Sequence, residues 1–195
     1  MSENEDIQSP SSSVSSNYQS PIHSKQETSK NKPNIKNNHL DINFTNSLLT
    51  ILNKNKNDND YYTKIKTNQD GHFTFKKKPS ISLLDYLRRI IYYLKIEYST
   101  LIIAMIYIDH LCKEKVFLNE YNIHRIMVIS IYMAYYYNED CIYDHNYLAL
   151  VSGISKKEMI TLEDDFLDLI EFKLFVSEKL LNNIKNIFCN NILII

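Results

Sequence analysis

PSISLLDYLRRIIYYL (residues 79–94) is followed by LIIAMIYIDHL (101–111), NIHRIMVISIYMAYYYNED (122–140) and GISKKEMITLEDDFLDLIEFKL (153–174). Each segment is long and rich in apolar residues, and Gly and Pro are almost absent from its interior. Apolar residues recur at the spacing of one helix face, or fill all faces, which is typical of core-facing and buried helices. Several such segments in succession predict an all-α bundle.

Local start signals accompany these helices. Ser80 and Ser82 mark the start of the first segment, and Ser99 is a candidate N-cap for the second. Asn119 or Glu120 is expected to open the third. After the break at Gly153, the pair Ser155 and Glu158 forms an S-x-x-E capping box for the last.

Helical patterns continue on both sides of the segments. Residues 40–52 carry apolar side chains at helical spacing, a short helix is expected around residues 146–150, and residues 178–188 form a last amphipathic segment. Residues 40–195 are therefore expected to form a single domain with its core at about 79–174. Residues 1–39 are rich in Ser, Asn and Lys, and such a composition predicts a disordered tail.

Composition excludes several functions. The net charge of −1 argues against nucleic-acid binding, which favours a basic excess. Two isolated glycines cannot form a phosphate-binding loop, and the histidines lack the spacing of a metal site. The longest apolar run is too short for a bilayer, and the polar, acidic N-terminus is unlike a signal peptide. We therefore expect an intracellular, non-membrane protein, in the nucleus or the cytoplasm, without cofactor, metal or catalytic residues.

One acidic residue lies inside an apolar segment. Asp109 in IYIDHL needs a cation or several donors if it is buried. Arg88 and Arg89 interrupt the preceding apolar helix and are candidates for that cation. An ion pair of this kind fixes the register of two helices and performs no chemistry.

The segments resemble the cyclin family, in particular the single-box P/U-type cyclins similar to fungal phosphate-response cyclins. PSISLLDYLRRI is similar to the group's PSISIEDYLERI, and Tyr107, Ile108 and Asp109 match its YID signature. The N-x-H-R motif of residues 122–125 is followed by SIYMAYYYNED, similar to SVMVAAKFLDD. YLALVSG and LEDDFLDLIEFKL match the last two motifs, YYAKVGG and LELEFLFLLDFRL.

The resemblance implies a cyclin box of five helices with one additional helix at each end. It also implies a regulatory subunit, not itself an enzyme, that binds and activates a cyclin-dependent protein kinase in cell-cycle or division control. The alternative is a cyclin-fold adaptor in transcription or signalling that activates no kinase.

The resemblance also implies roles for particular residues. Arg89 and Asp109 match the family's buried ion pair, and Glu163 matches the acidic residue that faces the kinase. Tyr136 stands where the family has a kinase-contacting Lys, so a hydroxyl replaces an ammonium. We expect the kinase contact to include the four residues Tyr136, Glu139, Asp140 and Glu163.

The tail contains two Ser-Pro dipeptides, at Ser9 and Ser20. They match the minimal target of proline-directed kinases, and a tethered tail would meet a bound kinase at high effective concentration. Both serines are candidate phosphorylation sites, with chance occurrence in a low-complexity tail as the alternative.

Overall fold

The regular structure of the described residues is entirely helical. The computed structural model describes residues 40–67, 71–114, 116–140 and 143–189, all within one compact unit, Ile35–Ile195. The helices are α1 (Leu40–Lys56), α2 (Tyr61–Thr67), α3 (Leu83–Leu94), α4 (Tyr98–Glu114), α5 (Ile123–Asn138), α6 (His145–Ser152), α7 (Lys156–Leu169) and α8 (Glu178–Cys189). The all-α prediction is confirmed, and the predicted tail, residues 1–39, lies outside the described residues.

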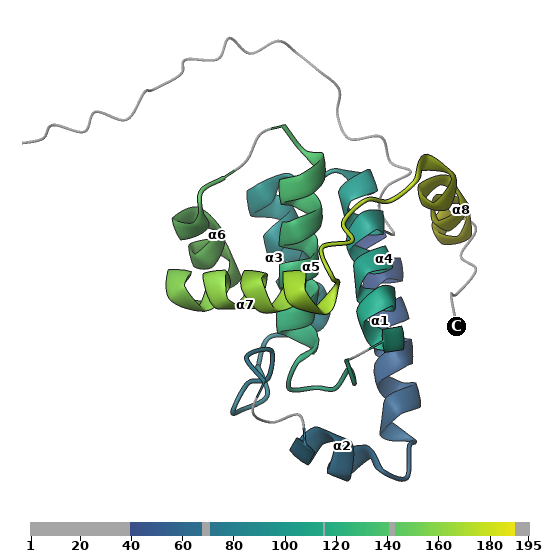
Figure 1. Ribbon diagram of the computed structural model, residues 1–195, viewed down its shortest axis with the longest axis vertical. Helices are drawn as coiled ribbons and strands as arrows, with labels where there is room; N and C mark the ends of the chain where they lie inside the picture. The colour runs from purple at the N-terminus through teal and green to yellow at the C-terminus, as the bar shows by residue number, and fades with distance from the viewer. Residues whose placement is uncertain (1–39, 68–70, 115, 141–142, 190–195) are drawn as a thin grey trace, which may run out of the picture. The chain divides into compact units, whose positions relative to one another are not determined.

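Helices α4 and α5 form the centre of the bundle (Figure 1). They pack against each other more extensively than any other pair, and nearly every side chain of α5 up to Tyr135 is buried. Helix α1 packs against α3 and α4, α7 crosses α5 and contacts α6, and α8 lies against α4. Because α5 is covered on most sides, only its C-terminal end offers side chains to solvent.

Two of the four predicted helix starts agree with the structure. Ser82 is the N-cap of α3, and its hydroxyl oxygen accepts a hydrogen bond from the Asp85 N–H. The capping box of α7 is present, with Ser155 Oγ accepting from the Glu158 N–H at 3.1 Å. Gly153 ends α6 in the left-handed conformation, at φ 71°, which glycine adopts without steric cost.

Two predicted helix starts are wrong. Helix α4 begins at Tyr98, so Ser99 lies inside it. Helix α5 begins at Ile123 and not at Asn119 or Glu120. Asparagine side chains close the turn before it, because Asn122 Oδ1 accepts a hydrogen bond from the Asn119 N–H at 2.8 Å. Asn–backbone hydrogen bonds of this kind compete with helix formation.

Helix α2 lies in a polar stretch for which no helix was predicted. Its inner face consists of Tyr61 and Ile65, which are four residues apart and buried. The Tyr61 ring packs against Phe117, with 5.8 Å between the ring centroids. Two apolar residues among Lys, Asn and Asp give too weak a periodic signal to be recognised in the sequence.

Candidate protein-binding face on α5, α6 and α7

The C-terminal end of α5 carries the first of the predicted contact residues. Tyr136 is 46% exposed, and its ring contacts Tyr132, one helical turn earlier, with 5.9 Å between centroids. Tyr132 is buried, and its ring in turn contacts the imidazole of His145 on α6. Tyr136 is therefore the exposed end of a row of rings that leads into the interior between α5 and α6.

Glu163 of α7 joins the same row from the other side. Its Oε2 lies 2.9 Å from His145 Nε2, and the Tyr132 hydroxyl lies 3.0 Å from that nitrogen. Burial, reinforced by the negative charge of Glu163, raises the pKa of the Tyr132 hydroxyl well above its ordinary value. The hydroxyl therefore stays neutral. Tyr132, His145 and Glu163, here called the α5–α7 junction, hold three helices in register.

The structure thus brings Tyr136 and Glu163 into one neighbourhood, but Glu163 does not project freely into solvent. Its side chain is 19% exposed and is engaged by His145. Tyr132 and His145 were not predicted as site residues. Tyr132 could have been found from the sequence, because it stands four residues before Tyr136 and so lies on the same helix face. His145 could be found only from the packing of α6.

Glu139 has a different orientation. As the residue that ends α5, it points to the start of α4, where its Oε1 accepts from Thr100 Oγ1 at 2.6 Å and from the Glu97 N–H at 3.3 Å. Thr100 is 1% exposed, so this contact is largely internal. Glu139 therefore connects the antiparallel helices α4 and α5, while its neighbour Asp140 is exposed.

The predicted ion pair between Arg89 and Asp109 is not formed. Arg89 on α3 is exposed, and its Nη2 donates to the Leu150 carbonyl of α6 at 3.1 Å. Asp109 pairs with Lys113 one turn along α4, at 2.8 Å, and its side chain is 46% exposed. Because α4 turns Asp109 towards its solvated edge, the carboxylate has no need of a cation from α3.

The neighbouring arginine makes an interhelical pair instead. Arg88 Nε lies 2.6 Å from Asp41 Oδ2, which links α3 to the first turn of α1. The other predicted sites, Ser9 and Ser20, lie outside the described residues. Among the described residues, no cluster of His, Cys, Asp and Glu could hold a metal ion, and no helix is long and apolar enough to cross a membrane.

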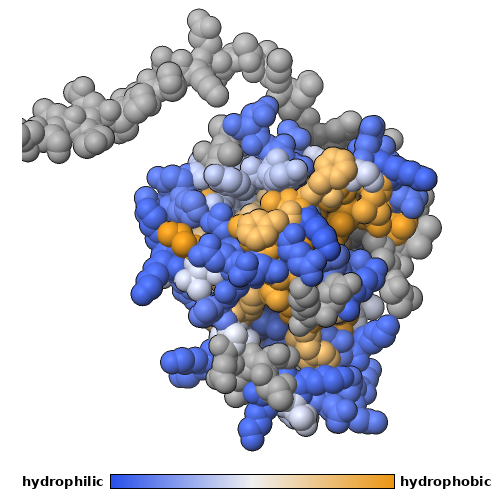
Figure 2. All heavy atoms as spheres, viewed as in Figure 1, coloured by the Kyte–Doolittle hydropathy of each residue, from blue (hydrophilic) through white to orange (hydrophobic). Residues whose placement is uncertain are grey.

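The segment after α7 extends the exposed aromatic surface. Phe172 is 67% and Phe175 78% exposed, and Glu171 and Phe172 both have left-handed backbone conformations. The buried Tyr107 of α4 anchors this segment, because its hydroxyl donates to the Leu174 carbonyl at 2.6 Å. Figure 2 shows apolar surface on this face, between α7 and α8.

This aromatic segment lies close to the end of α5. Tyr137 and Asn138 are near enough to Tyr107 to influence the pKa of its hydroxyl, which burial raises to about 12. Tyr136 and Tyr137, each about half exposed, stand at the end of α5, and Tyr137 lies near the buried Tyr107 that anchors the segment carrying Phe172 and Phe175. We call these four residues the aromatic face. Phe172 and Phe175 were not predicted, because sequence alone placed them beside a helix end without indicating their exposure.

The described residues form an all-helical module with an exposed aromatic face. The sequence matches the family profile described as Cyclin over residues 2–174. The chain belongs to the cyclin family.

The relatives agree with the predicted subgroup. The chain is 42% identical over 113 residues to Cyclin-U4-3 of Arabidopsis thaliana. The aligned region covers 57% of this chain and 52% of the relative. It is 37% identical over 102 residues to Cyclin-P4-1 of Oryza sativa subsp. japonica, covering 51% and 48%. For PHO85 cyclin-like protein psl1 of Schizosaccharomyces pombe, the identity is 33% over 108 residues, covering 54% and 44%. The matched region spans about half the length of these relatives.

The predicted cyclin box and the resemblance to P/U-type cyclins are thereby confirmed. Helices α3 to α7 are the five helices of the box, α1 precedes them and α8 follows. The short helix α2 is an addition to the predicted order.

Proposed function

We propose that this protein is the regulatory subunit of a cyclin-dependent protein kinase, and that it binds and activates the kinase through the aromatic face and the α5–α7 junction. Family membership supports the class of partner, and one relative is named as a PHO85 cyclin-like protein. The role in cell-cycle or division control, inside the cell, is part of the same proposal.

The observation that carries the proposal is the exposure of four aromatic side chains, two at the end of α5 and two on the segment after α7 that Tyr107 anchors. A folded protein gains stability by burying rings, so these four rings, which stay between 46% and 78% exposed, are candidates for an interface. Aromatic residues are enriched at the energetically dominant positions of protein interfaces. No catalytic role is needed for this surface to act.

The junction gives the face a defined geometry. In the proposed contact, Tyr136 offers a hydroxyl where the family has an ammonium, and Glu163 offers a carboxylate that His145 holds in place. A side chain already fixed by a neighbour loses less conformational entropy on binding. Asp140 contributes negative charge at the edge, whereas Glu139 supports the face from within.

Co-purification tests the proposal. Phe175→Ser should reduce recovery of a cyclin-dependent kinase catalytic subunit at least tenfold, because the variant removes one of the most exposed rings of the aromatic face. Tyr62→Ser is the matched control, since Tyr62 is 83% exposed but lies on α2, away from this face. Equal recovery of the kinase with both variants would contradict the assignment of the face. Recovery of a kinase without any gain in its activity would favour the adaptor alternative.

A further inference from the structure

The net charge of −1, which argues against nucleic-acid binding, conceals an uneven distribution of charge along the chain. Residues 54–78 contain seven lysines and three aspartates, so the rest of the chain carries an acidic excess. This basic segment includes the end of α1, the helix α2 and the loop that precedes α3, at the end of the bundle where α5 begins (Figure 1). A local basic excess attracts polyanions even where the whole chain is nearly neutral.

A cavity of about 490 Å³ opens beside these lysines. Pockets of roughly 300–1,000 Å³ are of the size that binds a small molecule or one unit of a polymer. The polar and aromatic side chains that line this one are Lys56, Tyr61, Tyr62, Lys66, Glu120 and Tyr121. The cavity therefore combines cations, one carboxylate and three phenol rings.

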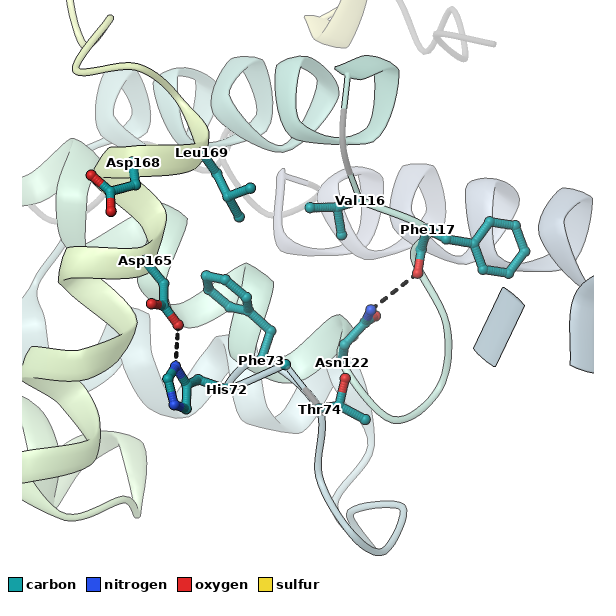
Figure 3. Close-up of a pocket in the computed structure, with 10 residues that line it drawn as sticks. His72, Phe73, Thr74, Val116, Phe117, Asn122, Asp165, Asp168 and Leu169 are labelled. Atoms are coloured by element: carbon teal, nitrogen blue, oxygen red, sulfur yellow. Dashed lines mark hydrogen bonds and ion pairs between the residues drawn. The ribbon is translucent and has the colours of Figure 1, made fainter. Parts of the chain in front are cut away.

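One wall of the cavity is built on the turn that precedes α5. In Figure 3 the Phe117 ring of this turn points away from the other labelled residues, and Tyr61 packs against it with 5.8 Å between the ring centroids. Asn122 Nδ2 donates to the Phe117 carbonyl at 3.0 Å, and Asn55 Nδ2 at the end of α1 donates to the Leu118 carbonyl at 2.7 Å. The turn is thus tied to α1 and α5, so the cavity is formed before any ligand binds.

The charged groups of the site leave both a cation and an acceptor available. Lys56 Nζ and Lys78 Nζ lie 2.9 and 3.5 Å from the same oxygen, Glu120 Oε2. The hydrogen bond from Lys56 lowers the pKa of Glu120, so the carboxylate is charged. Its second oxygen, Oε1, accepts no hydrogen bond from a described residue. Lys66 is exposed and forms no ion pair within the described part of the chain.

The rings provide flat surfaces beside these charges. Tyr62 is 83% exposed and meets the edge of Tyr61, with 5.4 Å between the ring centroids. The Tyr61 hydroxyl is buried and has no hydrogen-bond partner among the described residues, although the Glu120 backbone is near enough to influence its pKa. Buried hydroxyls are normally paired, so this one is a further donor for a ligand. Exposed rings next to cations are the surface on which nucleic-acid bases stack.

We propose that this end of the bundle binds single-stranded RNA, with one nucleotide in the cavity. The base stacks on Tyr62, the phosphates lie against Lys66 and the lysines of residues 76–78, and a ribose 2′-hydroxyl donates to Glu120 Oε1. A single strand fits better than a duplex, because its bases are free to stack on protein rings. DNA lacks the 2′-hydroxyl, and an acidic peptide lacks the planar ring and would place carboxylates beside Glu120.

This inference goes beyond the proposed function and does not rest on it. The cavity lies at the start of α5, whereas Tyr136 of the aromatic face lies near the end of that helix. RNA and a kinase would therefore occupy different ends of the bundle.

Fluorescence anisotropy with the full chain tests the RNA site. The probe is a fluorescein-labelled twelve-nucleotide oligoadenylate RNA, compared with oligodeoxyadenylate of the same length, with the same RNA paired to oligouridylate, and with a labelled oligoglutamate peptide. We expect the single-stranded RNA to bind, the DNA to bind about threefold more weakly, and the duplex and the peptide about tenfold more weakly. Absence of binding, or equal binding of the RNA to either the DNA or the peptide, would overturn the proposal.

The salt dependence measures the contribution of the phosphates. If the lysines neutralise about three phosphates, log K should fall against log salt concentration with a slope of about −2. Lys66→Gln should weaken RNA binding about threefold and make this slope shallower by about 0.7. Lys157→Gln is the matched control, because Lys157 is exposed on α7. Equal effects of the two variants would contradict the assignment of the cavity.

Tyr62→Ser tests the stacked base. It should weaken RNA binding about tenfold, within the range measured for one base on one ring. Tyr92→Ser is the control, since Tyr92 is 76% exposed on α3, and it should bind RNA as the unmodified chain does. Tyr62→Ser is expected to keep the kinase, so one variant separates the two surfaces. Unchanged RNA binding by Tyr62→Ser would overturn the site whatever the result with the kinase.

Discussion

The Tyr107 hydroxyl allows the aromatic segment after α7 to be tested without changing its surface. Tyr107→Phe removes one oxygen atom and keeps the ring, which is 1% exposed and packs against Phe166. The lost atom is the donor to the Leu174 carbonyl, 2.6 Å away. Because Leu174 lies between Phe172 and Phe175, loss of this hydrogen bond releases the backbone that carries both exposed rings.

The magnitude follows from the burial of that hydrogen bond. A neutral hydrogen bond contributes about 0.5–1.5 kcal/mol net, and a carbonyl left unsatisfied adds to the loss. We expect Tyr107→Phe to lower the free energy of unfolding by about 1–2 kcal/mol. For a domain of 150–250 residues, this corresponds to a fall in Tm of roughly 2–8 °C. Binding of the kinase should weaken as well, because the aromatic segment would have to be ordered on binding.

Urea unfolding followed by circular dichroism measures the stability, and co-purification measures the binding. Tyr92→Phe is the control, since Tyr92 is 76% exposed on α3 and its hydroxyl should contribute little. If Tyr107→Phe and Tyr92→Phe unfold at the same urea concentration, the anchoring role of Tyr107 is refuted.

Two further predictions concern local features. Burial lowers the pKa of His124, whose Nε2 lies 3.1 Å from the Ile81 carbonyl, so the unfolded chain binds a proton more readily than the folded one. The free energy of unfolding should therefore fall as the pH drops below the ordinary pKa of histidine. His124→Gln should reduce that fall, measured as urea midpoints at neutral and mildly acidic pH. Ser155→Ala removes the N-cap of α7 and should cost about 1 kcal/mol in thermal unfolding, whereas Ser80→Ala, at an exposed position outside the helices, should cost almost nothing.

The features that could be predicted from the sequence depend on residues close together in the chain. Ser82, Gly153 and the Ser155–Glu158 box act within one helical turn, so their role is visible without knowing the neighbours. The apolar periodicity of the five box helices is equally local. Family motifs in the right order then confirmed the class of fold.

The features that could not be predicted depend on how helices are rotated against each other. Asp109 lies in an apolar segment, yet the rotation of α4 leaves it half exposed beside Lys113. Glu139 was expected to face a partner, but it reaches the start of α4, 39 residues earlier in the chain at Thr100. His145 joins Glu163 only because α6 packs on α7. A one-dimensional pattern carries no information on these angles.

Activation of a cyclin-dependent kinase by the purified chain tests the central claim most directly. The unmodified chain should raise the activity of the catalytic subunit on a peptide substrate. Glu163→Lys should abolish the gain, because it reverses the charge at the α5–α7 junction and places an ammonium beside His145. Asp164→Lys makes the same charge change at the exposed neighbouring position and should activate as the unmodified chain does. Both variants should keep their helical circular dichroism. Full activation by a folded Glu163→Lys chain would contradict the account.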